Sequence, residues 1–233
     1  MNLATTNLLA VLIGVVYPIY IVATHQKVNS NIKRNEKYRL IDYKQTLLIF
    51  WGLTLLVLVN NFINEQPTLD FYPRVSIINI GVAILISAFA YFQYRTTKIT
   101  LDNVNAVKGK LKGIYHYLPT TFQELKWFTL VAVSAGICEE VIFRMFLFEF
   151  LRENSSLVIA FIATNIIFAI THIGSGRTNL ISSFILGLLF SAIYYFTKNI
   201  WLVVVLHIAI DINAGILGYR INKMTKLTDA DKC

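Results

Sequence analysis

The sequence contains few charged residues for its length. Lysine, arginine, aspartate and glutamate make up 15% of the 233 residues, whereas a soluble domain carries about a quarter. Hydrophobic residues make up 56% and stand in long uninterrupted runs, which are typical of membrane spans rather than of a large soluble core. The composition excludes an ordinary soluble enzyme. It predicts an all-α, polytopic transmembrane helical bundle, which we expect to be multi-pass in the plasma membrane.

Cysteine is almost absent. Cys138 lies inside an apolar run and Cys233 is the last residue, so we expect no disulfide framework. Apolar surroundings keep a thiol unreactive. We therefore interpret Cys138 as a packing residue and not as a nucleophile.

Basic residues outnumber acidic ones and give a net charge of +8. They concentrate between the apolar runs, in residues 25–44, in residues 95–126 and after residue 217. Retention of Lys and Arg on the cytoplasmic side of a membrane explains this distribution. We therefore expect the lipid bilayer, and no nucleic acid, as the partner of these charges.

Seven apolar runs are candidate membrane spans. Each approaches the ~20 residues that cross ~30 Å of hydrocarbon. If the N-terminus is outside, all of the basic segments and the C-terminus are cytoplasmic, which is the topology that we expect. The seven runs cover residues 3–24, 45–62, 74–94, 127–151, 157–172, 180–196 and 200–217.

A helix-start signal precedes the fourth run. Pro119 is followed by Thr121 and, three residues later, by Glu124. This spacing is that of a capping box, in which the two side chains bind each other's backbone amides. It predicts that the fourth helix begins before the membrane surface.

The fourth run contains charges that a bilayer does not tolerate without partners. Glu140 and Arg144 are four residues apart on one helical face, so we predict an ion pair with a structural or supporting role. Glu139 is rotated ~100° from Glu140 and has no such partner on its own helix. An intramembrane carboxylate of this kind favours a functional role.

Two later runs also carry polar faces. Phe168 and His172 are four apart at the end of the fifth run, so the aromatic ring can shelter the imidazole. His207 and Asp211 have the same spacing in the seventh run. The remaining histidines, at positions 25 and 116, lie in basic loops, where we expect them to be solvated.

These groups could converge on one cavity. A carboxylate and a histidine near a water can activate it for attack, and a second histidine can donate to a developing oxyanion. Glu139, His172 and His207 could equally hold a catalytic zinc ion with an open position. The residues by themselves leave both mechanisms open.

The polar residues form three short motifs in order: Glu139-Glu140-x-x-x-Arg144, Phe168-x-x-x-His172 and His207-x-x-x-Asp211. This arrangement resembles the CAAX protease and bacteriocin-processing family, also called CPBP or Abi, of intramembrane endopeptidases. The resemblance implies a catalytic core of four spans over residues 119–217. Residues 1–118 then form three N-terminal spans with basic loops, and residues 218–233 form a polar tail.

The resemblance also implies roles and a substrate class. Glu139 and His172 would activate the attacking water, and His207 with Asp211 would line the oxyanion site of a cavity open toward the cytoplasm. Some family members have Asn where this chain has Asp211. An ionised Asp cannot donate a hydrogen bond, so Asp211 is protonated by burial, orients His207 or binds a metal. We expect no cofactor, with a divalent metal such as zinc as the alternative. The expected substrate is a membrane-associated peptide or protein, in bacterial peptide processing, bacteriocin immunity or peptide signalling.

Two other functions fit a membrane bundle of this kind. One is a non-catalytic membrane regulator that binds a partner protein or an exported peptide. The other is a proton-coupled transporter, since Glu, His and Arg also form proton relays. Transporters often contain internal repeats and paired broken helices, and neither is evident in this sequence.

Overall fold

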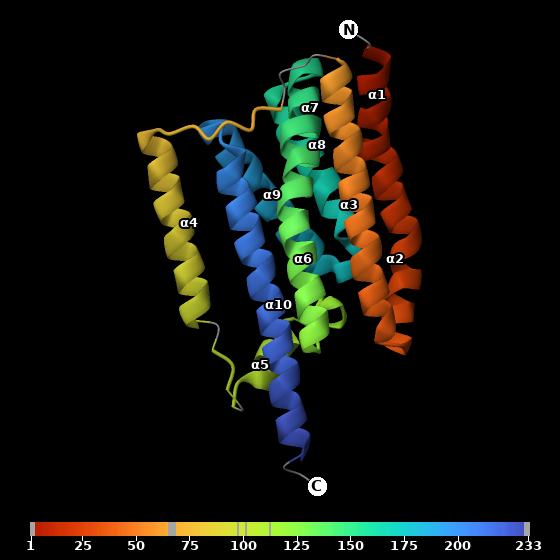
Figure 1. Cartoon of the computed structure of the whole chain (residues 1–233), viewed down its shortest axis with the longest axis vertical. Helices are drawn as coiled ribbons and strands as arrows, with labels where there is room; N and C mark the ends of the chain where they lie inside the picture. The colour runs from red at the N-terminus through yellow and green to blue at the C-terminus, as the bar shows by residue number, and fades with distance from the viewer. Residues whose placement is uncertain (1–2, 65–68, 97, 101, 112, 231–233) are drawn as a thin grey trace.

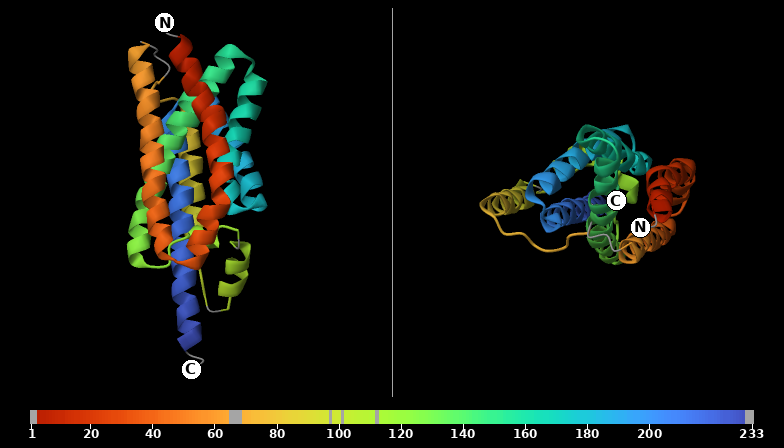
Figure 2. Two further views of the ribbon diagram at one scale, coloured as in Figure 1. Left: turned by 90° about the vertical axis from the view of Figure 1, so that its right-hand side faces the viewer. Right: turned by 90° about the horizontal axis from the view of Figure 1, so that it is seen from above.

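The computed structural model describes residues 3–64, 69–96, 98–100, 102–111 and 113–230. All regular secondary structure in these ranges is helical, as the composition predicts. The long helices stand side by side along one axis (Figure 1). The chain begins at one end of the bundle and α10 ends at the other (Figure 2).

The first helical segment is interrupted by a wide turn. It consists of α1 (Leu3–Val11), the π-helical η1 (Leu12–Val16) and α2 (Tyr17–Arg34). Pro18, the second residue of α2, has no backbone N–H. One α-helical hydrogen bond is therefore missing at this point. π-Helical turns such as η1 are found where the regular hydrogen bonding of an α-helix is interrupted.

The loop expected over residues 25–44 is wrong for most of its length. α2 continues to Arg34 and α3 (Lys37–Ile63) begins almost at once. The apolar run ends earlier than the helix because Gln, Lys and Arg are good helix formers outside a membrane. The two helices therefore meet in a short turn at the end of the bundle where α10 also ends (Figure 1).

The next segments cover one side and one end of the bundle. α4 (Ile77–Thr96) lies at the edge and packs on α9 and α10 (Figure 1). Asn79 links the start of α4 to the end of α9, because its Nδ2 donates to the carbonyl oxygen of Thr197 at 3.3 Å. The short helices α5 (Val104–Lys110) and η2 (Tyr115–Tyr117) follow in the chain.

The central helix carries the fourth expected span. It runs through α6 (Phe122–Glu139), the π-helical η3 (Glu140–Phe148) and α7 (Glu149–Asn154). The predicted capping box is confirmed: Oγ1 of Thr121 accepts from the amide of Glu124 at 3.1 Å, and the Glu124 carboxylate accepts from the amide of Thr121 at 3.1 Å. α6 packs between α3 and α10, and all residues of η3 are buried.

The last helices close the bundle. They are α8 (Leu157–Thr171), the short η4 (Ile173–Ser175), α9 (Arg177–Thr197) and α10 (Ile200–Ala230). Gly176 has a φ of 92°, a conformation that favours glycine, and it turns the chain from η4 into α9. The polar tail is helical as far as Ala230, and Cys233 lies outside the described residues.

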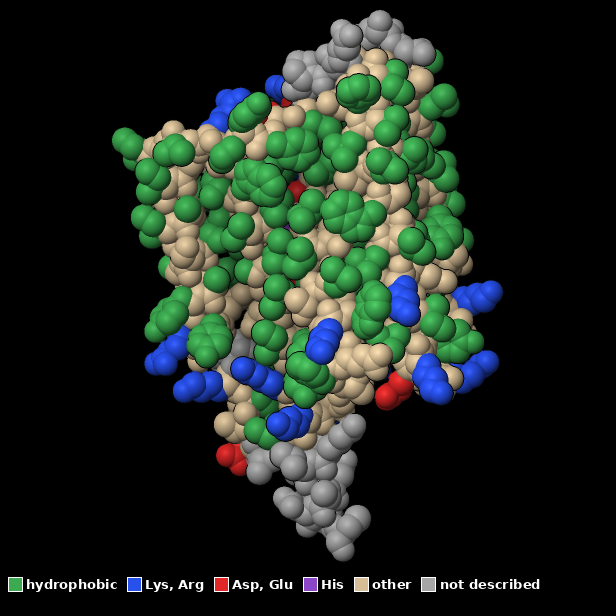
Figure 3. Space-filling model, in the orientation of Figure 1, with side chains coloured by type: hydrophobic (Ala, Val, Ile, Leu, Met, Phe, Trp, Pro, Cys, Tyr) green, Lys and Arg blue, Asp and Glu red, His purple; other side chains and the backbone are tan. Residues whose placement is uncertain are grey.

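The protein is a multi-pass membrane protein. Large apolar side chains cover the outside of the helices, and Lys and Arg gather toward the end where α10 finishes (Figure 3). Five helical segments are long and apolar enough to cross a membrane: Ala4–Arg34, Lys37–Ile63, Ile77–Arg95, Arg177–Thr197 and Ile200–Thr225. The fourth and fifth expected spans lie on α6 to α7 and on the shorter apolar α8, which are not among these five.

Candidate active site

The three motifs come from three helical segments that meet inside the bundle. Glu139 ends α6 and Glu140 begins η3, at the change from α- to π-helical geometry. His172 caps the C-terminus of α8. His207 lies in α10, and Asp211 follows one turn later.

The ion pair predicted from spacing is confirmed. Nη1 of Arg144 lies 3.1 Å from Oε1 of Glu140, and both side chains are completely buried. The Arg144 guanidinium also lies 4.3 Å from the ring centroid of Phe168, which adds a cation–π contact. Phe168 packs on His172 as well, with ring centroids 4.7 Å apart, as the shared helical face predicts.

His207 is the centre of the site. Its Nδ1 lies 2.7 Å from Oε1 of Glu140. Its Nε2 lies 3.6 Å from Oε2 of Glu139 and 3.6 Å from Oδ2 of Asp211. Three carboxylates from α6, η3 and α10 therefore surround one imidazole.

The contact between His207 and Glu140 was missed from the sequence, which assigned Glu140 to Arg144 alone. A carboxylate has two oxygens with several lone pairs and accepts more than one hydrogen bond. Periodicity identifies partners on the same helix, whereas this contact joins η3 to α10. Only the packing of these two helices brings it about.

The two ring nitrogens of His207 have different surroundings. Nδ1 donates to the Glu140 carboxylate. The 3.6 Å from Nε2 to Glu139 and to Asp211 is longer than a direct hydrogen bond. It is a separation that a bridging water or a substrate oxygen spans.

His172 is held in one tautomer by its own helix. Its Nδ1 lies 2.9 Å from the carbonyl oxygen of Phe168. A carbonyl only accepts, so Nδ1 carries the proton and Nε2 of the neutral ring carries a lone pair. His172 is close enough to Asp211 and His207 to interact electrostatically, but no hydrogen bond or ion pair joins it to Glu139 among the described residues.

Across the described part of the chain, no group of three or more His, Cys, Asp or Glu side chains is arranged so that it could hold a metal ion. The zinc alternative therefore stays a prediction.

The comparison with known families bears on this geometry. Residues 121–213 match the family model described as Type II CAAX prenyl endopeptidase Rce1-like. The resemblance to CAAX proteases is confirmed. The searches of curated proteins and of solved structures give no significant match. The Rce1-like region begins at the N-cap of α6 and contains all three motifs, while α1 to α4 precede it.

A cavity of about 180 Å³ opens beside His172. One wall comes from the end of α8 and from η4, inside the Rce1-like region. The other comes from α2, α3 and η2, which precede that region. The lining residues are Ile21, Thr24, His25, Val28, Asp42, Tyr117, Thr171, His172, Gly174 and Ser175.

Asn29 joins the segments around this cavity. Its Nδ2 donates to the carbonyl oxygen of Gly174 at 2.9 Å, directly after the turn that contains His172. Its Oδ1 accepts from the hydroxyl of Tyr117 and lies 3.1 Å from Nε2 of His116. A residue that precedes the Rce1-like region thus fixes η4, the turn that follows His172.

His116 is only partly solvated, contrary to the sequence-based expectation. The segment after α5 folds back on α2, so the ring is half-buried against Asn29. Burial, together with the nearby charges of Lys33 and Arg39, lowers the pKa of His116 to about 4. Its ring is therefore neutral at physiological pH, and Nε2–H donates to the Asn29 side chain.

A buried ion pair connects α3 to the start of α6. Nη1 of Arg39 lies 2.8 Å from Glu124, and its Nε donates to the carbonyl oxygen of His116 at 3.0 Å. Burial alone would raise the pKa of Glu124, but hydrogen bonds from Thr120 and Thr121 and the charge of Arg39 hold it below its usual range. This pair anchors the N-terminus of the Rce1-like region to a preceding helix.

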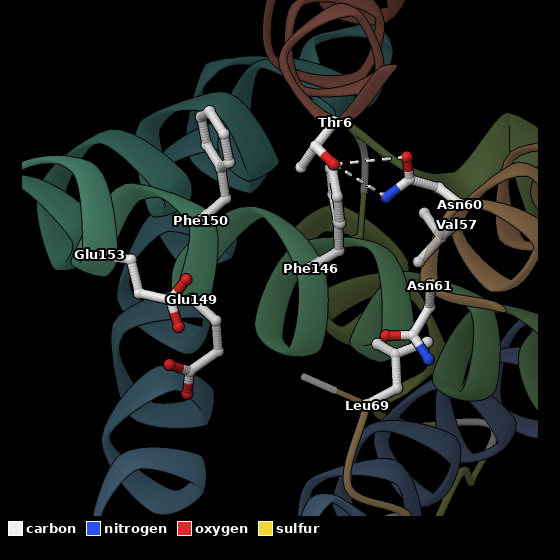
Figure 4. Close-up of a pocket in the computed structure, with 9 residues that line it drawn as sticks. All are labelled: Thr6, Val57, Asn60, Asn61, Leu69, Phe146, Glu149, Phe150 and Glu153. Carbon is white, nitrogen blue, oxygen red and sulfur yellow. Dashed lines mark hydrogen bonds between the residues drawn. The ribbon is translucent and has the colours of Figure 1, made fainter. Parts of the chain in front are cut away.

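A smaller hollow lies at the opposite end of the bundle, between α1, α3 and α7 (Figure 4). Its volume of about 30 Å³ holds about two waters. Thr6 and Asn60 bind each other across it at 3.4 Å, and Glu149 pairs with Arg152 at 2.5 Å. It contains none of the motif residues.

Proposed function

We propose that this protein is an intramembrane endopeptidase that hydrolyses a peptide bond in a membrane-associated peptide or protein. The Rce1-like match supports the reaction class. The observation that carries the mechanism is the position of His207, which faces Glu140 with Nδ1 and both Glu139 and Asp211 with Nε2. Ionisable groups inside a membrane bundle are costly, and they are retained where they act in a reaction or a pathway.

Glu139 is the general base of this reaction. It takes a proton from a water whose oxygen attacks the scissile carbonyl carbon. His172 accepts a hydrogen bond from the same water through Nε2, since its Nδ1 is committed to the helix. When the C–N bond breaks, the proton passes from Glu139 to the leaving nitrogen. Water is consumed, and an acid and an amine are formed.

His207 stabilises the oxyanion. With both ring nitrogens protonated, its Nε2–H donates to the carbonyl oxygen as that oxygen gains charge. Glu140 fixes the ring through Nδ1 at 2.7 Å. Asp211 orients it from the next turn of α10.

The burial of the charged side chains and the distribution of Lys and Arg also support a topology of seven membrane spans. α6 to α7 and α8 cross the membrane as the fourth and fifth spans, giving seven in total. Their polar groups face protein and not lipid, which is the condition for charges at membrane depth. The end of the bundle that is rich in Lys and Arg (Figure 3) faces the cytoplasm, and the N-terminus lies outside.

Cleavage of a lipid-anchored, quenched fluorescent peptide by the purified protein in proteoliposomes tests the proposal. Glu139→Gln removes the base and should lower kcat by about 1,000-fold, within the usual contribution of a positioned general base. Glu153→Gln, an exposed carboxylate on the same helical segment, is the matched control and should keep full activity. Equal cleavage by wild type and Glu139→Gln would contradict the proposal. A chelator arm decides whether a bound metal contributes.

A further inference from the structure

We infer that the cavity beside His172 binds a basic side chain, lysine or arginine, of the peptide substrate, with Asp42 as its counter-ion. This inference rests on the proposed endopeptidase function and adds a substrate preference to it. It concerns residues of α2 and α3 that precede the Rce1-like region.

The size of the cavity fits one side chain. Its volume of about 180 Å³ has room for on the order of ten waters. Pockets for whole small-molecule ligands are larger, roughly 300 to 1,000 Å³. Because His172 is part of the lining, a side chain bound there belongs to a residue close to the scissile bond.

The lining offers hydrogen-bond acceptors. The hydroxyl of Thr24 donates to the carbonyl of Tyr20 at 2.8 Å, and that of Thr171 donates to the carbonyl of Phe168 at 2.7 Å. The hydroxyl proton of Tyr117 is likewise used, on Asn29. The protons of these three hydroxyls are therefore used, and their oxygens can act only as acceptors toward a bound group.

The two histidines of the lining have the same polarity. Nδ1 of His25 lies 2.7 Å from the carbonyl oxygen of Val22, just as Nδ1 of His172 faces the carbonyl of Phe168. In a neutral ring Nε2 is then an acceptor; that of His172 is used by the attacking water, so His25 is the histidine that offers an acceptor to a bound side chain. These acceptors fit a donor-rich group, and ammonium and guanidinium carry three and five donors.

Asp42 supplies the negative charge. It is the acidic member of the lining and is partly buried. The cations nearest to it in sequence are engaged elsewhere: Arg39 pairs with Glu124 at 2.8 Å, and Lys44 lies over the ring of Trp127. A carboxylate in a narrow cavity is stabilised when a cation enters.

The test uses neutral-lipid proteoliposomes and lipid-anchored, quenched peptides with an acetylated N-terminus. In a neutral host sequence, one position at a time is occupied by lysine or by norleucine, which has a similar chain without the charge. The measured quantity is the ratio of kcat/KM for each lysine peptide to that for its norleucine partner. At one or two adjacent positions, wild type should give a ratio of about ten to one hundred.

Variants of Asp42 test whether this residue causes the preference for lysine over norleucine. Asp42→Asn should bring the ratio to about one, and Asp42→Lys should make a glutamate peptide the better substrate. Asp70→Asn, at a partly exposed acid that pairs with Arg74 and does not line the cavity, is the control and should keep the wild-type ratio. A non-acetylated series distinguishes a free N-terminal amine from a side chain as the source of the ammonium group; a preference that appears only there overturns the side-chain assignment.

The outcomes separate this inference from the proposed function. If wild type cleaves lysine and norleucine peptides equally at every position, the inference is overturned and the endopeptidase stands. If Asp42→Asn keeps the lysine preference, Asp42 is not the counter-ion and the inference is again overturned. If folded wild-type protein cleaves none of the peptides, both the side-chain preference and the proposed endopeptidase function are overturned. The comparison of lysine and norleucine peptides uses only the wild-type protein. It can therefore overturn the inference even if the Asp42 variants fold poorly.

Discussion

Nδ1 of His207 on α10 lies 2.7 Å from Oε1 of Glu140 on η3, the same oxygen that Arg144 binds at 3.1 Å. One buried carboxylate oxygen therefore serves both an imidazole and a guanidinium. The geometry links the ion pair, which spacing alone identifies as structural, to the histidine at the centre of the proposed active site.

The shared carboxylate gives the first prediction. Glu140→Ala leaves the guanidinium of Arg144 buried without its counter-ion, and the protein should lose about 3–5 kcal/mol of unfolding free energy. The double variant Glu140→Leu with Arg144→Met should recover part of that loss, because it removes the unpaired guanidinium, although His207 still lacks its acceptor. Unfolding in detergent measures both. A double variant as unstable as the single one would show that the charge pair is not the cause.

The second prediction concerns the close approach of α6 and α10. A Cβ on Gly136 would lie 2.4 Å from Cγ1 of Ile208 and 3.2 Å from the carbonyl oxygen of Val204. Gly136→Ala should force the helices apart and cost about 1–3 kcal/mol. It should also lower kcat by at least tenfold, since the 3.6 Å separation of Glu139 and His207 depends on this packing.

Gly52→Ala is the control for this substitution. A Cβ at Gly52 meets nothing within 4 Å, so stability and activity should stay at the wild-type level or rise slightly with helix propensity. Equal behaviour of the two glycine variants in an unfolding assay and a cleavage assay would contradict the packing argument.

The third prediction concerns Asn29. Asn29→Ala removes the hydrogen bond to Gly174 and leaves the hydroxyl of Tyr117 without its acceptor. The turn after His172 should loosen, so kcat should fall about tenfold while KM changes little. Faster hydrogen exchange at the amide of Gly176 would report the same loosening directly. Asn105→Ala on α5, an exposed position, should change neither quantity.

The fourth prediction is a pH dependence of stability. The pKa of His116 is about 4 in the folded protein and ordinarily about 6.5, so between these values the unfolded chain binds the extra proton. Stability is therefore full above pH 6.5 and falls as the pH drops toward 4. The half-buried ring is partly screened by solvent, which limits the loss to about 1–2 kcal/mol.

His116→Gln isolates this contribution. Glutamine can still donate to Asn29 but does not titrate in this range. Unfolding free energies measured from pH 4.5 to 7 should show a smaller loss for the variant than for wild type. Parallel curves for the two proteins would mean that His116 does not contribute to the pH dependence.

Much of the fold could be predicted from the sequence because it depends on local chemistry. The apolar runs predicted the helices, and the Thr121 and Glu124 pair predicted where α6 begins. Helix ends were less predictable, since polar residues such as those before Arg34 continue a helix beyond the apolar run. The π-helical η3 has no periodic signal and was not foreseen.

The sequence by itself determined which residues pair along one helix, because a fixed rise and rotation place positions i and i+4 on one face. Glu140 with Arg144, and Phe168 with His172, follow from this rule. Only the tertiary structure decided that Glu140 also binds His207 and that Asn29 holds the turn after His172. Such contacts join segments far apart in the chain, and the packing of whole helices, which no local spacing encodes, sets their distances.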